Sequence, residues 1–121
     1  RRGATRGAFG DGCEQRGKKR DIVTRAGREV EARRLRVRKA GRAVDVLGNR
    51  EAGVWVSMVK GMVPERVCQI IDQAIQMHGA AGISQWSPLG RMYAQQRTLR
   101  LADGPDEVHH MVVGRAELRR H

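Results

Sequence analysis

Apolar residues recur at intervals of three and four along most of this chain, which is the period of an amphipathic α-helix and not of a β-strand. The first such stretch spans about residues 23–47 and ends at Gly48 and Asn49, two residues that often terminate a helix. Arg33 occupies one position of its apolar seam. The other seam positions are Val23, Ala26, Val30, Val37, Ala40, Val44 and Leu47. This pattern predicts one long helix.

Three further helical patterns follow the first. A second helix is predicted over about residues 51–78, where Pro64 is expected to kink it, and it ends at the glycine-containing segment 79–82. A third is predicted to begin with Ser87 as the N-cap and Pro88 at the first helical position, and a fourth follows an Asp-Gly-Pro segment. Aromatic residues make up only 3% of the chain, which also favours helices packed on helices. The sequence therefore predicts an all-α fold, an up-and-down helical bundle.

The length of 121 residues supports one domain. Residues 1–20 are rich in Gly, Arg and Lys, so we expect them to be loop or only partly ordered. Cys13 and Cys68 are far apart and lack a CxxC spacing, which predicts two free thiols. His109 and His110 point in different directions on a helix, and neither shares a metal-ligand spacing with His78. We therefore expect no metal site and take all three histidines to be structural or surface residues.

The formal net charge of +11 is concentrated in the first third of the chain. Residues 1–42 hold 15 Lys/Arg and 5 Asp/Glu, a net charge of +10, whereas residues 43–121 hold 9 and 8, a net charge of +1. A basic helical module that binds nucleic acid is therefore one alternative. The chain lacks a known nucleic-acid-reading motif and has few aromatic residues for base stacking, so nucleic acid is not the expected partner.

No run of about 18 apolar residues occurs, and the first residues lack the apolar core of a secretory signal. We therefore expect an intracellular protein with no membrane span.

Two helix junctions place backbone N–H groups and polar side chains at helix starts, where anions tend to bind. They are AIQMHGAAG at 74–82 and LRLADGPDEVH at 99–109.

The chain resembles the C-terminal helical domain of the acyl-CoA dehydrogenase family in these two junctions and in five further segments, which suggests a fragment of such an enzyme. The further segments are RGAFG at 6–10, VLGN at 46–49, MVKGMVP at 58–64, IDQAIQ at 71–76 and SPLGRMY at 87–93. The similarity is to the branch with the ADGPDEVH motif and covers nearly the whole chain.

The resemblance implies FAD-dependent α,β-dehydrogenation of an acyl-CoA thioester, in which a carboxylate removes the α-proton and the β-hydrogen leaves as hydride to the flavin. Asp103 matches that carboxylate, and Asp103 and Gly104 match positions that bind the substrate. On local sequence alone, Asp103 could instead be the N-cap of the last helix, paired with Asp106 in a capping box. Without the other two domains of the family, we expect the chain alone to be inactive. A flavin-free oligomerisation bundle is a further alternative.

The same resemblance implies a flavin site shared between two subunits. Arg6 and Phe9 match positions that contact the FAD of the neighbouring subunit, and Gln76, with the backbone near Ala80, matches the other half of that contact. Two more positions that match cofactor contacts are Pro105 and Glu107. The expected assembly is a homodimer or a dimer of dimers. The expected compartment is the cytoplasm in a bacterium, and mitochondria or peroxisomes in a eukaryote.

Overall fold

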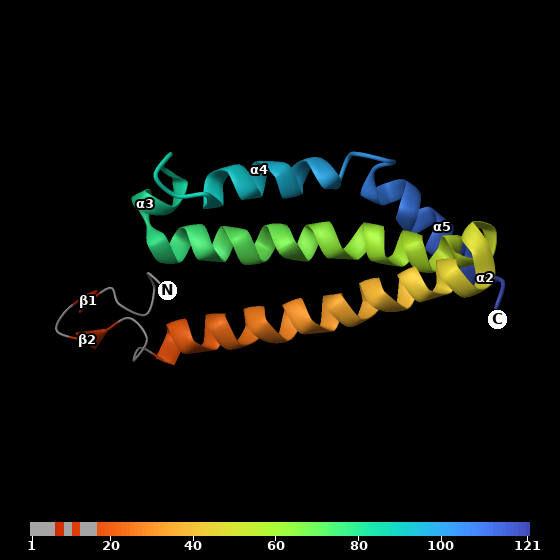
Figure 1. Ribbon diagram of the computed structural model, residues 1–121, viewed down its shortest axis with the longest axis horizontal. Coiled ribbons are helices and arrows are strands. Elements are labelled where there is room, and N and C mark those ends of the chain that lie inside the picture. Colours follow the sequence, from red (N-terminus) through yellow and green to blue (C-terminus); the bar gives the residue numbers. More distant parts are fainter. Residues whose placement is uncertain (1–6, 9–10, 13–16) are drawn as a thin grey trace.

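Helices form almost all of the computed structural model, which describes residues 7–8, 11–12 and 17–121 (Figure 1). Two short strands, β1 (Gly7–Ala8) and β2 (Asp11–Gly12), pair antiparallel, with Gly7 opposite Gly12. The helices are α2 (Gly17–His78), α3 (Ala80–Ile83), α4 (Leu89–Leu99) and α5 (Asp106–Leu118). The prediction of an all-α fold is confirmed.

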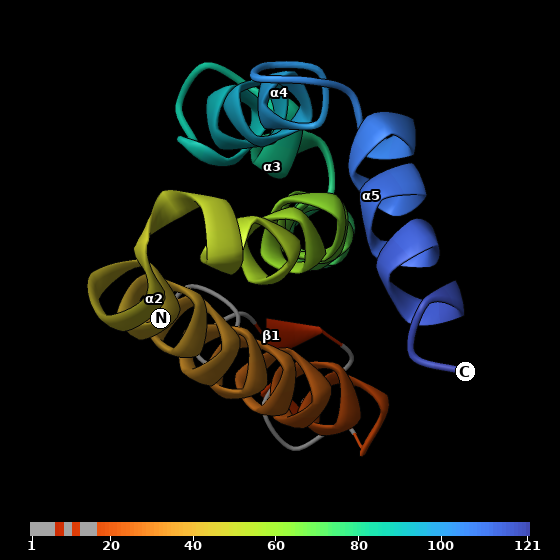
Figure 2. The same ribbon diagram turned by 90° about the vertical axis from the view of Figure 1, so that its right-hand side faces the viewer.

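A sharp turn at Gly48 divides α2 into two helical arms, the first arm at 17–47 and the second arm at 49–78. Gly48 has φ 79° and ψ 167°, which is outside helical geometry and is accessible to glycine because it has no Cβ. The chain reverses direction there, and the two arms lie side by side (Figures 1 and 2). The helix end predicted at Gly48 is therefore confirmed.

The other helix boundaries agree with the sequence pattern within a few residues. The first arm begins at Gly17, so the last four residues of the segment 1–20, which was expected to be loop or partly ordered, are helical. Pro64 lies inside the second arm, which continues to His78. Helix α4 has Pro88 at the N-cap position instead of the predicted Ser87, whose hydroxyl accepts a hydrogen bond from the Leu89 N–H at 3.3 Å.

Helices α4 and α5 both pack against α2. Helix α4 runs along the second arm. Helix α5 is angled relative to α4 and packs on α2 near its Gly48 end (Figures 1 and 2). An open apolar groove of about 390 Å³ lies between the two arms and α4. Its lining includes Val37, Val44, Val56, Val59, Val63 and Leu99. The bundle is therefore incompletely closed on this side.

The buried apolar core is thin. Among the described residues it consists of Ala40, Ala52, Cys68 and Ile71. At least fifteen large apolar side chains are exposed: Val23, Val30, Leu35, Val37, Val46, Leu47, Val56, Ile83, Trp86, Met92, Leu99, Leu101, Val108, Met111 and Leu118. The chain exposes 9121 Å², whereas a compact monomer of this mass exposes about 6,500 Å². Much of its apolar surface is thus left without a covering layer.

Cys68 is a free thiol in this core, as the sequence indicated. Burial raises the pKa of the Cys68 thiol, and the nearby Arg100 and Arg97 oppose that shift without reversing it. Cys13 lies outside the described residues. The thiol of Cys68 therefore acts as a small apolar group in the packing between α2 and its neighbours.

Candidate functional site

The turn between α4 and α5, residues 100–105, has an unusual backbone. Asp103 has φ 54° and is the one residue other than glycine with positive φ in the described part of the chain, and Gly104 follows with φ 97°. These two left-handed residues follow each other in the loop that changes the direction of the backbone between α4 and α5 (Figure 1). Backbone strain of this kind often marks a functional site.

An ion pair closes this turn. Arg100 Nε lies 2.5 Å from Asp106 Oδ2, and the Asp106 N–H donates to the Arg100 carbonyl oxygen at 3.2 Å. Asp106 is 5% exposed, and its hydrogen bond raises the pKa of the Arg100 guanidinium. The buried carboxylate is thus matched with a cation at the base of the turn.

The alternative interpretation of Asp103 as a helix cap is wrong. Helix α5 begins at Asp106 with Pro105 in the N-cap position, and no side chain caps it. Asp106 binds Arg100 and so does not complete a capping box with Asp103. The Asp103 side chain is exposed and free of any capping role.

The turn brings together four of the residues singled out from the sequence. Asp103, Pro105 and Glu107 are exposed, and Gly104 is partly buried. All four belong to the junction of α4 and α5. The junction therefore carries one exposed acidic residue in the turn and a second in the first turn of α5.

Three contacts that the sequence did not indicate hold the turn against α2. Lys60 Nζ donates to the Gly104 carbonyl oxygen at 3.0 Å. His109 Nε2 lies 3.2 Å from the Asp103 carbonyl oxygen, and His109 Nδ1 lies 3.2 Å from Ser57 Oγ. His109 was expected to be structural or at the surface, and Lys60 lies in the matched MVKGMVP segment without an assigned role. Because Lys60 is 44 residues from Gly104, sequence spacing alone gave no sign of the contact.

The residues expected at a shared flavin site lie at the other end of α4. Gln76 is in the last turn of α2 and Ala80 begins α3, and both are exposed. Gly79, between them, has φ 62°, so the helix break predicted at this glycine is confirmed. Helix α4 is 11 residues long, or about 16 Å, and separates this junction from the Asp103 turn.

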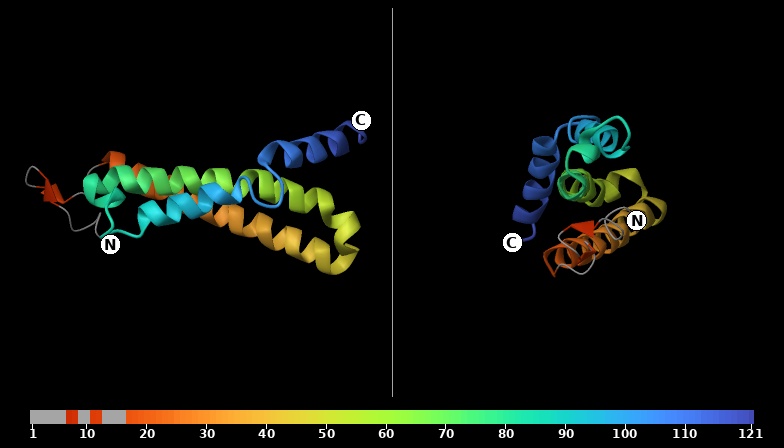
Figure 3. Two further views of the ribbon diagram at one scale, coloured as in Figure 1. Left: turned by 90° about the horizontal axis from the view of Figure 1, so that it is seen from above. Right: turned by 90° about the vertical axis from the view of Figure 1, so that its left-hand side faces the viewer.

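Arg6 and Phe9, the other half of that expected contact, lie outside the described residues. The strands β1 and β2 occupy the same end of the molecule as α3 (Figures 1 and 3). Among the described residues, the structure thus separates the sequence-derived site residues into two groups, one at each end of α4.

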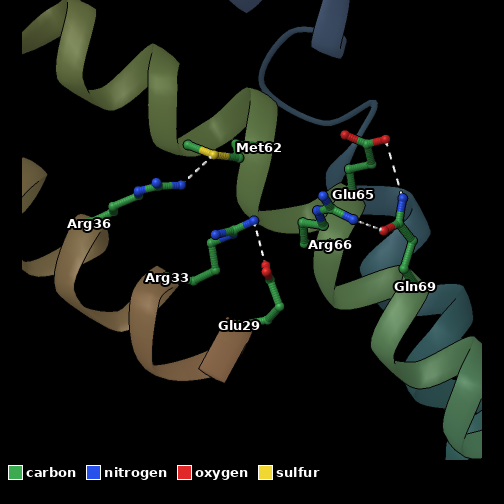
Figure 4. A network of polar contacts seen from close by, with 7 residues as sticks. All are labelled: Glu29, Arg33, Arg36, Met62, Glu65, Arg66 and Gln69. Atoms are coloured by element: carbon green, nitrogen blue, oxygen red, sulfur yellow. Dashed lines mark hydrogen bonds and ion pairs between the residues drawn. The ribbon is translucent and has the colours of Figure 1, made fainter. Parts of the chain in front are cut away.

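Part of the basic charge of the first arm is compensated within the molecule (Figure 4). Arg33, in the apolar seam, pairs with Glu29 one turn earlier at 2.6 Å, and its side chain is 11% exposed. Arg36 Nη1 donates to Met62 Sδ on the second arm at 2.9 Å. Arg33 is tolerated at a seam position because the carboxylate of Glu29 compensates its charge from one turn earlier.

The described residues contain no group of His, Cys, Asp and Glu that could hold a metal ion. Nor does any helix in the described part of the chain have the length and apolar character needed to cross a membrane.

Comparison with known proteins identifies one family. Residues 4–118 match the model of the acyl-CoA dehydrogenase C-terminal domain. The chain is 42% identical to the probable acyl-CoA dehydrogenase FadE2 of Mycobacterium tuberculosis over 93% of its length and 28% of that protein. It is 50% identical to acyl-CoA dehydrogenase family member 11 of Rattus norvegicus over 74% of its length and 12% of that protein. The chain therefore spans less than a third of these relatives.

Solved structures show the same arrangement of helices. A Mycobacterium abscessus protein assigned to the acyl-CoA dehydrogenases is 41% identical, with a TM-score of 0.94 over 98% of this chain and 29% of that one. The butyryl-CoA dehydrogenase of Megasphaera elsdenii is 22% identical, with a TM-score of 0.83 over 96% of this chain and 30% of that one. The second likeness concerns the fold alone.

Proposed function

The chain belongs to the acyl-CoA dehydrogenase family, and on that premise we propose that it is the C-terminal helical segment of an FAD-dependent acyl-CoA dehydrogenase. Its substrate would be an acyl-CoA thioester. The observation that carries this proposal is the turn between α4 and α5, where an exposed carboxylate lies on a left-handed backbone that two helices hold in place.

In this proposal Asp103 is the catalytic base that removes the α-proton of the thioester. A carboxylate is suited to this step because it can take a proton from a carbon that the adjacent thioester carbonyl has made acidic. Asp103 is exposed here, and covering it with another domain would remove water and strengthen its interaction with the substrate. We therefore expect the chain alone to have no dehydrogenase activity.

Acyl-CoA dehydrogenases are flavoproteins, and the described residues fit part of a flavin site. Gln76 offers an exposed amide that can donate to a phosphate or carbonyl oxygen, and Ala80 leaves the junction open. At the other end of α4, Pro105 and Glu107 adjoin the proposed base. FAD, when bound, would accept the β-hydrogen as hydride. Arg6 and Phe9 would complete the contact from their own subunit.

A shared flavin site would require two copies of the chain. We propose a homodimer or a dimer of dimers, in which the α2–α3 junction of one subunit meets cofactor bound mainly by the other. The many exposed apolar side chains support an assembly of this kind, because contiguous apolar surface is typical of interfaces. We further propose an intracellular enzyme, cytoplasmic in a bacterium and mitochondrial or peroxisomal in a eukaryote.

The test uses a hybrid enzyme, defined as the Mycobacterium abscessus protein with its matching segment replaced by residues 4–118 of this chain. Turnover of acyl-CoA by the unaltered host is measured first. In the hybrid, Asp103→Asn should reduce turnover by about 10²- to 10⁴-fold, the range of general-base catalysis, and leave the flavin content unchanged.

Asp103→Glu is the matched control, because it keeps the carboxylate and lengthens its reach by one methylene. We expect it to retain far more turnover than Asp103→Asn. Full turnover in the Asp103→Asn hybrid would rule out Asp103 as the base.

A further inference from the structure

One face of the second arm of α2 meets the turn that bears the proposed base. Ser57 and Lys60 are three residues apart and therefore lie on the same face of the helix. Lys60 Nζ donates to the Gly104 carbonyl oxygen at 3.0 Å, and His109 Nε2 lies 3.2 Å from the Asp103 carbonyl oxygen. Two consecutive carbonyl groups of the turn are thus bound by side chains from two different helices.

The contacts of His109 determine its protonation pattern. A carbonyl oxygen can only accept, so Nε2 must carry the proton that it donates to Asp103. In the neutral ring Nδ1 is then an acceptor, and the Ser57 hydroxyl donates to it at 3.2 Å. Ser57 is 7% exposed, so water competes little for this hydroxyl. The Asp103 carbonyl oxygen therefore selects the tautomer, and the buried serine helps to fix the direction of the imidazole.

Close packing of α5 on α2 makes these contacts possible. A Cβ at Gly61 would lie 2.9 Å from His110 Cδ2 and 3.6 Å from His109 Cβ. Gly61 has no side chain, which leaves room for the ring of His110 beside the helix that carries Ser57 and Lys60. The turn is thereby brought within the reach of the Lys60 ammonium group.

The backbone of the turn requires such support. An L-residue in the left-handed region costs about 1–2 kcal/mol, and Asp103 is in that region with φ 54°. Hydrogen bonds to the carbonyl groups of Asp103 and Gly104 oppose relaxation to an ordinary conformation. They also leave the Asp103 side chain exposed, where a substrate could meet it.

We propose that Lys60 and His109 are positioning residues that hold the Asp103–Gly104 turn in the geometry needed for proton abstraction, with Ser57 orienting His109. This inference rests on the proposed function, because it assigns the two residues to the same base. Neither residue is proposed to touch the substrate. Their effect is to fix the carboxylate in space.

The kinetic test measures the rate constant of flavin reduction in the hybrid enzyme after rapid mixing with acyl-CoA. Lys60→Met keeps the length of the side chain and removes the donor, and His109→Leu removes both ring contacts. Each should lower the rate constant by about 10- to 100-fold, since a displacement of about 1 Å can cost 10²-fold. The concentration of acyl-CoA that gives half the maximal rate should change little.

A conservative variant separates positioning from general stability. His109→Gln retains an amide N–H that can donate to the Asp103 carbonyl oxygen, so it should recover most of the rate lost in His109→Leu. His110→Leu changes the exposed neighbour, for which no polar contact with the turn is present, and should leave the rate constant unchanged. Equal losses in the Gln and Leu variants of His109 would overturn the assigned hydrogen bond.

The outcomes also separate this inference from the proposed function. If turnover survives Asp103→Asn, the assignment of Asp103 as the base is wrong. If Asp103→Asn abolishes turnover while Lys60→Met and His109→Leu react within about twofold of the unaltered hybrid, the base stands and the positioning role is overturned.

A measurement on the 121-residue chain itself needs neither flavin nor substrate. Nitrogen NMR of the histidine-labelled chain, with His109→Leu used to assign the signals, reports which ring nitrogen carries the proton. We expect the neutral His109 ring to be protonated at Nε2. In Ser57→Ala the Nδ1 signal should shift, because the hydroxyl beside that nitrogen is removed. A ring protonated at Nδ1 would contradict the proposed contacts.

Discussion

Gly104 shows how a single residue type permits the turn at the proposed site. Its φ of 97° is strained for any residue with a Cβ, and a Cβ there would lie 3.3 Å from His109 Nε2. Gly104 therefore serves both the backbone conformation and the approach of the imidazole.

Replacement of this glycine tests both requirements. Gly104→Ala should lower the free energy of unfolding of the chain by about 1–2 kcal/mol, the cost of left-handed geometry for an L-residue. Gly114→Ala is the control, because Gly114 is within α5 and a Cβ there meets nothing within 4 Å. The control should gain up to about 1 kcal/mol from the higher helix propensity of alanine. Urea unfolding followed by circular dichroism measures both, and equal stability of the two variants would argue against strain at Gly104.

At the residue scale, the motif in the sequence indicated Asp103. The sequence could not indicate which side chains hold the Asp103–Gly104 turn in place. A motif specifies which residue types follow one another along the chain. The contacts from Lys60 and Ser57 join positions 44 and 52 residues apart, and they depend on how α5 lies against α2. His109 was accordingly expected to have no special role.

At the scale of the elements, glycines determine where the helices end. Gly48 and Gly79 both have positive φ, and both were identified from the sequence because each follows a long helical pattern. The apolar period likewise gave the positions of the two arms, α4 and α5. The start of α2 at Gly17 was less accessible, because residues 17–22 contain only one apolar residue, Ile22, on which a period could be based.

Arg33 also shows the limit of a pattern based on single residues. It places a charge in the apolar seam of the first arm, but Glu29 compensates that charge from one turn earlier. The pairing follows from the helical period, since residues four apart lie on the same face.

Gly82 differs from the glycines that end helices, because it is needed for the close approach of α3 to α2. A Cβ at this position would lie 2.6 Å from the Ile75 carbonyl oxygen and 2.9 Å from Ile75 Cα, which are backbone atoms of α2. We expect Gly82→Ala to lower the free energy of unfolding by about 1–3 kcal/mol, because the short helix α3 must shift. Gly61→Ala is the matched comparison, since its closest neighbour is the ring of the exposed His110, which can turn aside.

Thermal unfolding of both glycine variants checks this expectation. Gly82→Ala should melt well below the unaltered chain, and Gly61→Ala close to it. If Gly61→Ala is the more damaging of the two, the approach of α5 to α2 is more tightly constrained than the junction at α3.

At the scale of the whole molecule, the two sequence-derived groups of residues lie at opposite ends of α4. The Asp103 turn would face substrate, and the junction near Gln76 would face flavin from another subunit. The thin core, the apolar groove and the exposed apolar side chains are consistent with a segment that larger surroundings cover. No pattern of local spacing could foresee this exposure, because it depends on what packs against the chain.

The central claim is that this segment supplies the base that removes the α-proton, and exchange of that proton with solvent tests it most directly. The hybrid enzyme is incubated with acyl-CoA in deuterium oxide, and deuterium at the α-carbon is measured by mass spectrometry. We expect incorporation with the unaltered segment and a fall to background with Asp103→Asn, whatever the fate of the hydride. Undiminished incorporation in Asp103→Asn would contradict the claim, because another group would then be removing the proton.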